Sequence, residues 1–360
     1  MVLNHHGGEI KEKIKYDFSV NVNPLGMPYY VKNAIVDGID MLCEYPDRCY
    51  VNLKNSIAEY EGIKPDQILC GNGASELIMA ICAFVSNKKM LNYSDGNGLK
   101  RQSRISALIQ SPTFSGYERA IKAYGGDAVY YRNYDEVISF IEDNTENLGI
   151  DIIFICNPNN PTGEVINKAR LAHLMDIAKK KNIFVVLDEC FIDFTHEESL
   201  VSQNSYDNLI VLKAFTKFYA LAGVRLGYIC MAKEVCERIS DFLPEWNVST
   251  VAQLAGVAAI SDKKRASKWK EDTIHLIDEE RSYLTKELIE LGFEVSDSKA
   301  NYLLCKSEDS KLWEKLRAIG ILVRDCGNFS GLNSSYIRIC VSTHEKNEIL
   351  ISAIKGLIRG

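Results

Sequence analysis

The stretch Lys213-Ala-Phe-Thr-Lys217-Phe-Tyr-Ala-Leu-Ala-Gly-Val-Arg225-Leu-Gly227 is the most informative part of this 360-residue sequence. Lys217 follows an apolar run and lies among aromatic and small residues, surroundings that lower the pKa of a lysine amine and leave it nucleophilic. Arg225 precedes another apolar run and can bind a phosphate through two parallel hydrogen bonds. A lysine in a mixed segment is usually exposed to solvent, so a chemical role for Lys217 needs support from the rest of the chain.

Short apolar runs alternate with amphipathic segments from about residue 66 to residue 230. The runs predict strands, and the segments between them predict helices. This alternation is typical of an α/β domain with a mostly parallel sheet between helices. The expected strands are Gln67–Cys70, Ala107–Gln110, Ala128–Tyr131, Asp151–Cys156, Ile183–Leu187, Leu209–Leu212 and Leu226–Ile229. The expected helices include Ser75–Val85, Gly116–Ala123, Tyr134–Glu142 and Lys168–Lys181.

The chain beyond residue 262 has a different pattern. A long charged helix is expected over Lys264–Leu291, followed by strands and a closing helix at Glu345–Ile358. The strands expected here are Phe293–Val295, Tyr302–Lys306, Ile321–Val323 and Tyr336–Cys340. We therefore predict three parts: an N-terminal segment (1–40) packed on the small domain, a large domain (41–261), and a smaller α+β domain (262–360). Residues 87–106 contain turn signals and charges, which favour an exposed insertion.

Polar residues follow three of the expected strands. Asp188 ends an apolar run, at the edge where α/β proteins bind ligands, although a helix cap is an alternative role for such an acid. Asn160 lies in the turn after the strand that ends at Cys156. Ala74 and Ser75 open a helix behind Gly73, and a helix N-terminus offers free N–H groups to a phosphate. Each signal has an ordinary structural explanation, so it is their combination that indicates a site.

Taken together, these motifs resemble the fold-type I pyridoxal-phosphate (PLP) enzymes, the aspartate aminotransferase superfamily, over nearly the whole chain. The resemblance implies a PLP-dependent transferase-like fold in which Lys217 holds PLP as an imine and Asp188 pairs with the pyridine nitrogen. It also implies a homodimer in which Tyr45 reaches the phosphate of the neighbouring subunit. The other implied cofactor contacts are Asn160 at the ring hydroxyl, Phe114 on the ring face, and Gly73, Ala74, Ser75, Thr216 and Arg225 around the phosphate.

Two positions depart from the pattern of these relatives. Ala214 stands where many of them have Ser or Thr, so we expect one phosphate contact to be missing. Phe191 stands where they often have a Tyr that donates to the ring hydroxyl. Because Phe191 cannot donate, the resemblance leaves Asn160 alone at that oxygen.

The N-terminal residues indicate the branch of the superfamily. His6-Gly-Gly8 and Asp17-Phe-Ser-Val-Asn21-Val-Asn23-Pro24-Leu25-Gly26 look like the threonine-phosphate decarboxylases of cobalamin synthesis, as do Phe191 and Arg324-Asp-Cys326. This branch implies decarboxylation of O-phospho-L-threonine or O-phosphoserine to a phosphorylated amino alcohol. The implied substrate contacts are His6 and Arg324 at the phosphate, and Asn23, Leu25, Gly26 and Arg338 near the carboxylate.

Two other interpretations stay open. Histidinol-phosphate aminotransferases, which use 2-oxoglutarate or glutamate, share the cofactor motifs but usually have Tyr at the position of Phe191. The fold also serves as a non-catalytic ligand-sensing module in some transcription regulators. A binding module would tolerate loss of Lys217, which is present. The enzyme interpretation is therefore favoured.

Composition excludes several other classes. The net charge is −6 and no basic cluster dominates, which argues against nucleic acid or an acidic membrane as the main partner. No apolar run reaches about 18 residues, so we expect no membrane span, and the N-terminus lacks the pattern of a signal peptide. The eleven cysteines are scattered without a Cys-x-x-Cys pair, as in a reduced cytoplasmic protein without a metal site.

Overall fold

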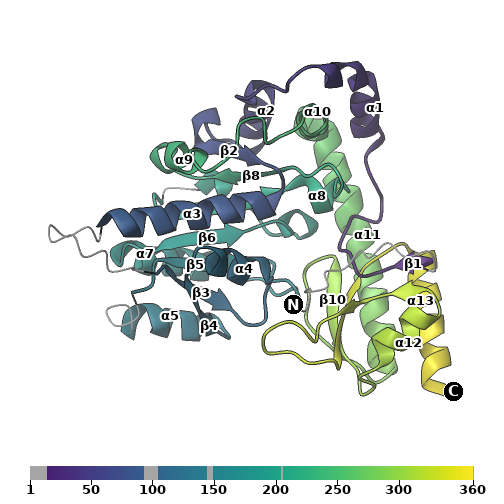
Figure 1. Ribbon diagram of the computed structural model, residues 1–360. Helices are drawn as coiled ribbons and strands as arrows, with labels where there is room; N and C mark the ends of the chain where they lie inside the picture. Colours follow the sequence, from purple (N-terminus) through teal and green to yellow (C-terminus); the bar gives the residue numbers. More distant parts are fainter. Residues whose placement is uncertain (1–13, 93–103, 144–148, 204–205, 360) are drawn as a thin grey trace.

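A seven-stranded sheet forms the centre of the larger part of the molecule, in the order β2-β8-β7-β6-β5-β3-β4 (Figure 1). The structure is a computed structural model that describes residues 14–92, 104–143, 149–203 and 206–359. The strands are β2 (Ile68–Gly71), β3 (Ser106–Gln110), β4 (Asp127–Tyr131), β5 (Ile152–Cys156), β6 (Phe184–Asp188), β7 (Leu209–Ala214) and β8 (Gly227–Cys230). Neighbours are parallel except at β8, which runs antiparallel to both β2 and β7.

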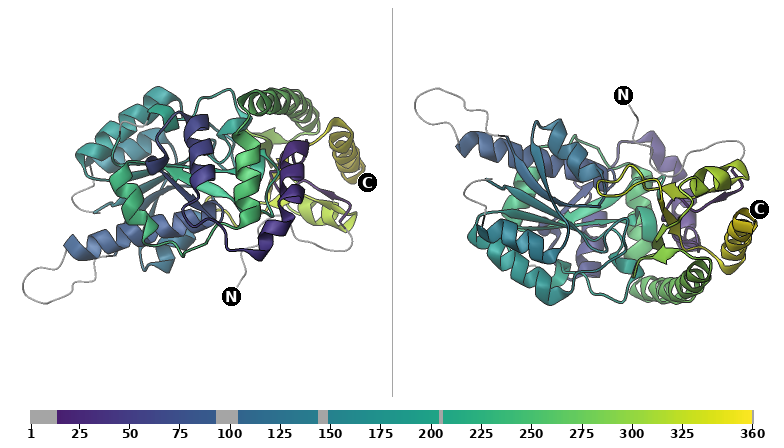
Figure 2. Two further views of the ribbon diagram at one scale, coloured as in Figure 1. Left: turned by 90° about the horizontal axis from the view of Figure 1, so that it is seen from above. Right: turned by 90° about the horizontal axis from the view of Figure 1, so that it is seen from below.

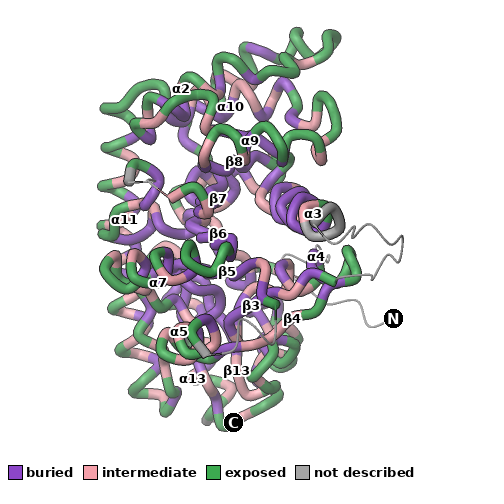
Figure 3. Tube along the Cα trace, turned by 90° about the vertical axis from the view of Figure 1, so that its left-hand side faces the viewer, coloured by how far each residue is buried: buried purple, intermediate pink, exposed green. Residues whose placement is uncertain are grey.

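Helices cover both faces of this sheet, because its central strands are buried on both sides. Figure 2 shows the two helical layers, and Figure 3 shows buried strands between helices whose outer sides are exposed. One layer contains α3 (Ala74–Asn92), α4 (Gly116–Ala123) and α9 (Lys233–Ser240). The other contains α2 (Val51–Glu61), α5 (Tyr134–Asp143), α7 (Lys168–Lys180) and α10 (Thr250–Ile260). The predicted α/β architecture of the large domain is confirmed.

The smaller part begins with α11 (Lys263–Glu290) and contains a four-stranded antiparallel sheet in the order β12-β13-β10-β9. Its strands and helices are β9 (Glu294–Val295), β10 (Tyr302–Lys306), α12 (Leu312–Ala318), β12 (Arg324–Asp325), β13 (Tyr336–Cys340) and α13 (His344–Arg359). A short strand, β11 (Ile321–Leu322), pairs in parallel with the N-terminal β1 (Tyr16–Asp17). The next helix, α1 (Tyr29–Asp37), instead packs on α10 of the larger part. The N-terminal segment therefore contacts both parts, whereas the sequence predicted contact with the small one.

The structure differs from the sequence prediction at one segment and adds helices that were not predicted. The expected insertion 87–106 is partly regular structure: α3 continues to Asn92, Ile105 is buried, and β3 begins at Ser106. Residues 93–103 lie outside the described part of the chain. The sequence also failed to predict α1, α2, α9, α10 and α12. None of the helices in the described residues is both long and apolar enough to span a membrane.

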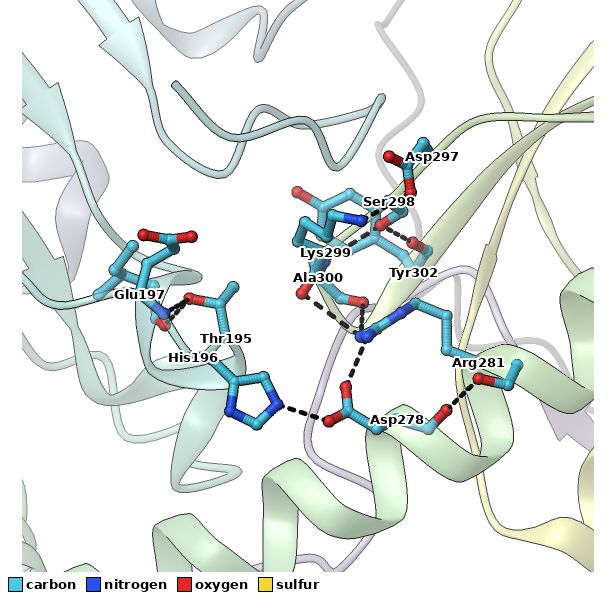
Figure 4. Close-up of polar contacts among 12 residues, drawn as sticks. Thr195, His196, Glu197, Asp278, Arg281, Asp297, Ser298, Lys299, Ala300 and Tyr302 are labelled. Atoms are coloured by element: carbon cyan, nitrogen blue, oxygen red, sulfur yellow. Dashed lines mark hydrogen bonds and ion pairs between the residues drawn. The ribbon is translucent and has the colours of Figure 1, made fainter. Parts of the chain in front are cut away.

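Polar contacts join the two parts along α11 (Figure 4). Asp278 of α11 accepts from Arg281, with 2.5 Å between Oδ1 and Nη2, and contacts His196 of the large part, with 2.7 Å between Oδ2 and Nε2. Arg281 also donates to the carbonyl of Ala300, just before β10. Tyr302 of β10 in turn donates to the carbonyl of Asn159 at 2.9 Å. These bonds position the small sheet against the loop that carries Asn160.

Candidate active site

A cavity of about 450 Å³ lies where the carboxyl ends of β5, β6 and β7 meet the small domain, a typical volume and place for a ligand site. Because β8 is antiparallel, its amino end reaches the same edge of the sheet and brings Arg225 there. Among the described residues, five basic side chains line the cavity together with a single carboxylate, that of Asp188. The basic residues are Arg119, Lys217, Arg225, Arg324 and Arg338. The cavity is therefore suited to anionic ligands.

Lys217 lies in the short helix α8 (Phe215–Phe218), directly after β7. Burial lowers the pKa of its amine, and the positive charges of Arg338 and Arg225 act in the same direction. A lower pKa leaves more of the amine neutral and able to attack a carbonyl carbon. Asn23 holds the backbone here, because its N–H donates to the Lys217 carbonyl at 3.0 Å and its side chain donates to the Phe218 carbonyl at 2.8 Å.

Asp188, at the end of β6, is a buried carboxylate at the floor of the cavity. Tyr117 of α4 donates to its Oδ2 at 2.6 Å, and the Cys190 N–H donates to Oδ1 at 3.0 Å. Burial raises the pKa of Asp188, while these two donors oppose the rise. No cation pairs with this carboxylate within the described residues. A protonated ring nitrogen would compensate the charge, so Asp188 fits the pyridine nitrogen of PLP.

A second group fits the phosphate of PLP. The first residues of α3, Ala74 and Ser75, line the cavity, and helix N-termini bind anions. Gly73 has φ +78°, and a Cβ atom there would lie 2.7 Å from Nη2 of Arg225. Gly73 thus lets the Arg225 guanidinium lie against the loop, although Gly73 itself is not a lining residue. Thr216 also lines this end, next to Lys217.

The residues expected at the ring also line the cavity. Phe114 packs edge-on against Tyr117, with 5.4 Å between ring centroids. The Oδ1 atom of Asn160 accepts from Nη1 of Arg338. This bond fixes the orientation of the amide and turns its donor nitrogen away from Arg338, as a bond to the ring hydroxyl requires. Phe191 packs edge-on against Tyr302, 5.0 Å between centroids, and has no hydroxyl to offer.

Arg324 and Arg338 form a pair of like charges. They are direct partners across β12 and β13, and both are buried in the wall of the cavity. Burial lowers the pKa of Arg324, and the charge of Arg338 lowers it further. Arg324 donates to Asn328 at 2.9 Å and lies over the ring of Phe329. Arg338 donates to the Ser19 carbonyl at 2.8 Å, but its Nε is buried without a partner in the described residues.

Several residues expected at the substrate lie elsewhere. Asn23 is occupied in holding the Lys217 backbone, Leu25 is exposed, and Gly26 forms a turn with φ +77°. None of the three lines the cavity, whereas Ser19, Val20 and Asn21 do. Residues after Asn21 do not line the cavity because the chain leaves it at Asn23, whose side chain donates to Thr273 of α11. Tyr45 is exposed beside Trp246, 4.9 Å between ring centroids, and His6 lies outside the described residues.

The sequence did not single out all of the residues that the fold brings to this cavity. Asn21 is buried, lines the cavity, and has a side-chain oxygen without a partner in the described part of the chain. Asn21 lies two residues before Asn23 in the same N-terminal motif, and the sequence prediction placed Asn23 rather than Asn21 at the substrate. Tyr117 follows Phe114 by one helical turn, and this spacing could have placed it behind the ring. The lining residues missed from the sequence are Ser19, Val20, Asn21, Ser115, Arg119, Cys156, Cys190 and Phe329.

The fold and this site define a PLP-dependent enzyme: a desolvated lysine, a buried acid and a phosphate cradle meet at one edge of an α/β sheet. When bound, PLP supplies an electron sink next to the substrate. Residues 13–354 match the family model described as aminotransferase class I and II. The chain belongs to this family.

Relatives with two different reactions resemble the chain over almost its whole length. A threonine-phosphate decarboxylase of Salmonella typhimurium is 34% identical, with 99% of this chain and 97% of the relative covered. A histidinol-phosphate aminotransferase of Methanosphaera stadtmanae is 30% identical, covering 94% and 89%. The solved histidinol-phosphate aminotransferase of Clostridium acetobutylicum is 32% identical with a TM-score of 0.82, covering 96% and 99%. The family and its cofactor are thereby established, whereas the reactions of these relatives differ.

Proposed function

We propose that this protein decarboxylates an O-phosphorylated amino acid, O-phospho-L-threonine or O-phosphoserine, and releases carbon dioxide and a phosphorylated amino alcohol. The pairing of Arg324 with Arg338 carries the proposal. Like charges directly opposite each other on a sheet destabilise it, and burying them adds a desolvation cost. A ligand with two anionic groups that binds at both arginines would compensate their charges. An O-phosphorylated amino acid carries a carboxylate and a phosphate a few atoms apart.

The contacts of each arginine assign the two groups. Arg338 also orients Asn160, and its Nε has no partner in the described residues, so we assign Arg338 to the α-carboxylate. Arg324 contacts Phe329 and Asn328, and we assign it to the phosphate. Asn21 lines the same cavity with a side-chain oxygen that has no partner in the described residues, and we assign Asn21 to the substrate in place of Asn23.

Binding at both Arg324 and Arg338 would also determine which bond to the substrate Cα atom is broken. The bond to Cα that lies perpendicular to the cofactor ring is the one that breaks, so the orientation of the substrate decides the reaction. A single arginine leaves the substrate free to rotate about one contact. Binding at both Arg324 and Arg338 fixes that rotation, and we infer that it sets the carboxylate perpendicular to the ring. Lys217 then serves to hold or move a proton at its Nζ atom.

The second candidate is an aminotransferase of the histidinol-phosphate type. The identity of 32% to the solved enzyme of Clostridium acetobutylicum favours it. A dicarboxylate such as 2-oxoglutarate would also neutralise Arg324 and Arg338. In that reaction the Cα–H bond, rather than the carboxylate, is held perpendicular to the ring, with Lys217 as the base.

We also propose that the active unit is a homodimer. The segment from α1 through η1 (Ile39–Cys43) to the start of α2 exposes several large apolar side chains, and we infer that they form an interaction surface. The exposed apolar residues are Tyr29, Val36, Ile39, Met41, Leu42, Tyr45 and Val51. Tyr45 belongs to this surface and would reach the cofactor phosphate of the second copy. The mass measured by light scattering after gel filtration tests this, and a monomer at micromolar concentration would contradict it.

One pair of assays separates the two reactions. The PLP-loaded protein is incubated with O-phospho-L-threonine in the absence of any keto acid, and carbon dioxide and the amino alcohol phosphate are measured. Histidinol phosphate with 2-oxoglutarate is assayed in parallel for glutamate. We expect carbon dioxide in the first reaction. Glutamate in the second reaction alone would refute the decarboxylase proposal and favour the aminotransferase.

A further inference from the structure

One cation in the cavity is not used by the proposed reaction. Arg119 lies on α4, three residues after the start of that helix, and lines the cavity together with Ser115. Its backbone N–H donates to the Ser115 carbonyl at 3.1 Å, so the two residues lie one turn apart on the same side of α4. The guanidinium is exposed and has no hydrogen bond or ion pair within the described residues. The neighbouring acid, Glu118, is paired with Lys122 instead.

Arg119 and Arg324 belong to different domains that touch at this end of the cavity. Ser111, which leads from β3 toward α4, donates to the Ser330 carbonyl of the small domain at 2.9 Å. Ser330 directly follows Phe329, whose ring lies beneath the Arg324 guanidinium at 5.4 Å from the centroid. The segment before Arg119 and the loop after Arg324 are therefore joined by a hydrogen bond. Both arginines line the one cavity between them.

The charge of a phosphate monoester requires more than Arg324. Such a group carries about −1.5 to −2 charges at pH 7, and one guanidinium neutralises about half of that. One nitrogen of Arg324 is already bound to Asn328. Arg338 is occupied by Ser19 and Asn160 and, under the proposed function, by the carboxylate. Among the four arginines that line the cavity, Arg119 is the one whose side-chain donors are all available within the described residues, because Arg225 donates to the Ala222 carbonyl.

We propose that Arg119 is a specificity residue that binds the substrate phosphate from the large domain, opposite Arg324 of the small domain. The phosphate then joins the two domains across the mouth of the cavity. This inference rests on the proposed phosphorylated substrate and adds a residue for which the resemblance implied no role. A substrate without the phosphate would lose this connection, so Arg119 selects phosphorylated over unphosphorylated amino acids.

Binding of an unreactive probe tests the inference without relying on turnover. The probe is 3-phosphoglycerate, which has a carboxylate and a phosphate but no amine, and glycerate is its counterpart without phosphate. Dissociation constants for both are measured by calorimetry on the PLP-loaded protein. We expect Arg119→Ala to weaken 3-phosphoglycerate by about 10- to 100-fold, as for loss of a hydrogen-bonded charge. Binding of glycerate should stay within about twofold, because Arg119 does not contact the carboxylate.

Control variants make the outcome specific. Lys122→Ala removes a cation from the same helix that is paired with Glu118 and does not line the cavity, and it should leave both constants unchanged. Arg119→Lys should restore part of the affinity, since it restores the charge without the two-pronged geometry. Unchanged binding of 3-phosphoglycerate by Arg119→Ala would overturn the inference. If the unmodified protein binds the two probes equally well, the proposed phosphorylated substrate itself fails.

Discussion

Replacing Tyr117 by Phe tests whether the hydrogen bond to Asp188 controls the chemistry of the site. The hydroxyl donates to Oδ2 of Asp188 at 2.6 Å, and both groups are buried. The ring is stacked on Phe154, 4.8 Å between centroids, and Phe would keep this packing. Tyr117→Phe therefore removes one donor from a buried carboxylate and changes little else.

The size of the effect follows from the surroundings of Asp188. A hydrogen bond to a charged group contributes about 1.5–3 kcal/mol. The Cys190 backbone N–H, which donates to Oδ1, would remain in the variant. Burial already raises the pKa of Asp188, and loss of the Tyr117 hydroxyl raises it further. Since 1.36 kcal/mol corresponds to one pH unit, the increase is about one to two pH units.

The direction of the pH dependence is fixed by the role of Asp188. The carboxylate must be ionised to hold a proton on the pyridine nitrogen, so activity is lost as the pH falls through the pKa of Asp188. In Tyr117→Phe this acid limb of the kcat/KM profile should move upward by about one to two pH units. Affinity for PLP, measured by equilibrium dialysis, should fall most at low pH. An acid limb and a PLP affinity identical to those of the unmodified protein would refute the role of Tyr117.

Three further variants have defined outcomes. Lys217→Ala should abolish both turnover and the absorbance of the imine with PLP, and an imine band retained in this variant would contradict the central assignment. Lys213→Met breaks a buried ion pair with Glu61, in which Nζ and Oε1 are 2.9 Å apart. The free energy of unfolding, measured by urea titration, should fall by about 3–5 kcal/mol. Unchanged stability would contradict a stabilising role of this pair. Gly73→Ala places a Cβ atom against Arg225 and strains a left-handed backbone. The affinity for PLP should therefore fall at least about tenfold. An unchanged affinity would show that the loop can shift to accept the Cβ atom.

A matched variant is available for the stability measurement. Lys306 forms a 2.8 Å pair with Glu294, and the two side chains are 40% and 76% exposed, in contrast to the buried pair of Lys213. Lys306→Met should leave the denaturation midpoint nearly unchanged, because solvent screens exposed pairs. Equal losses for Lys213→Met and Lys306→Met would show that the measured effect is due to the substitution itself and not to burial of the charge.

Elements with regular patterns could be predicted from the sequence. The β5 and β6 strands are short apolar runs that end at polar residues, and α4 matched its predicted bounds. The α10 helix was not predicted from the sequence, because it is apolar on nearly all sides and packs between α1, α2 and α11. Its periodicity is therefore weak, although Ser249 caps it by accepting from the Ala252 N–H. A short apolar helix of this kind cannot be distinguished from a buried strand by pattern alone.

The site was predictable where a motif lies at the end of one strand. Asp188, Asn160 and Lys217 all line the cavity as expected. The contacts between distant segments were not predictable, because they depend on register and on the meeting of two domains. The direct opposition of Arg324 and Arg338 is set by the pairing of β12 with β13, which no local pattern reveals.

The opposition of these two arginines also bears on how the protein can be engineered. In the absence of ligand the pair weakens the small sheet, since the two positive charges face each other in a buried wall. Replacing Arg324 by a neutral residue of similar volume would relieve this repulsion. A selection for heat resistance alone would therefore enrich such replacements and discard the anion site, so a campaign to improve robustness must screen for ligand binding in the same round.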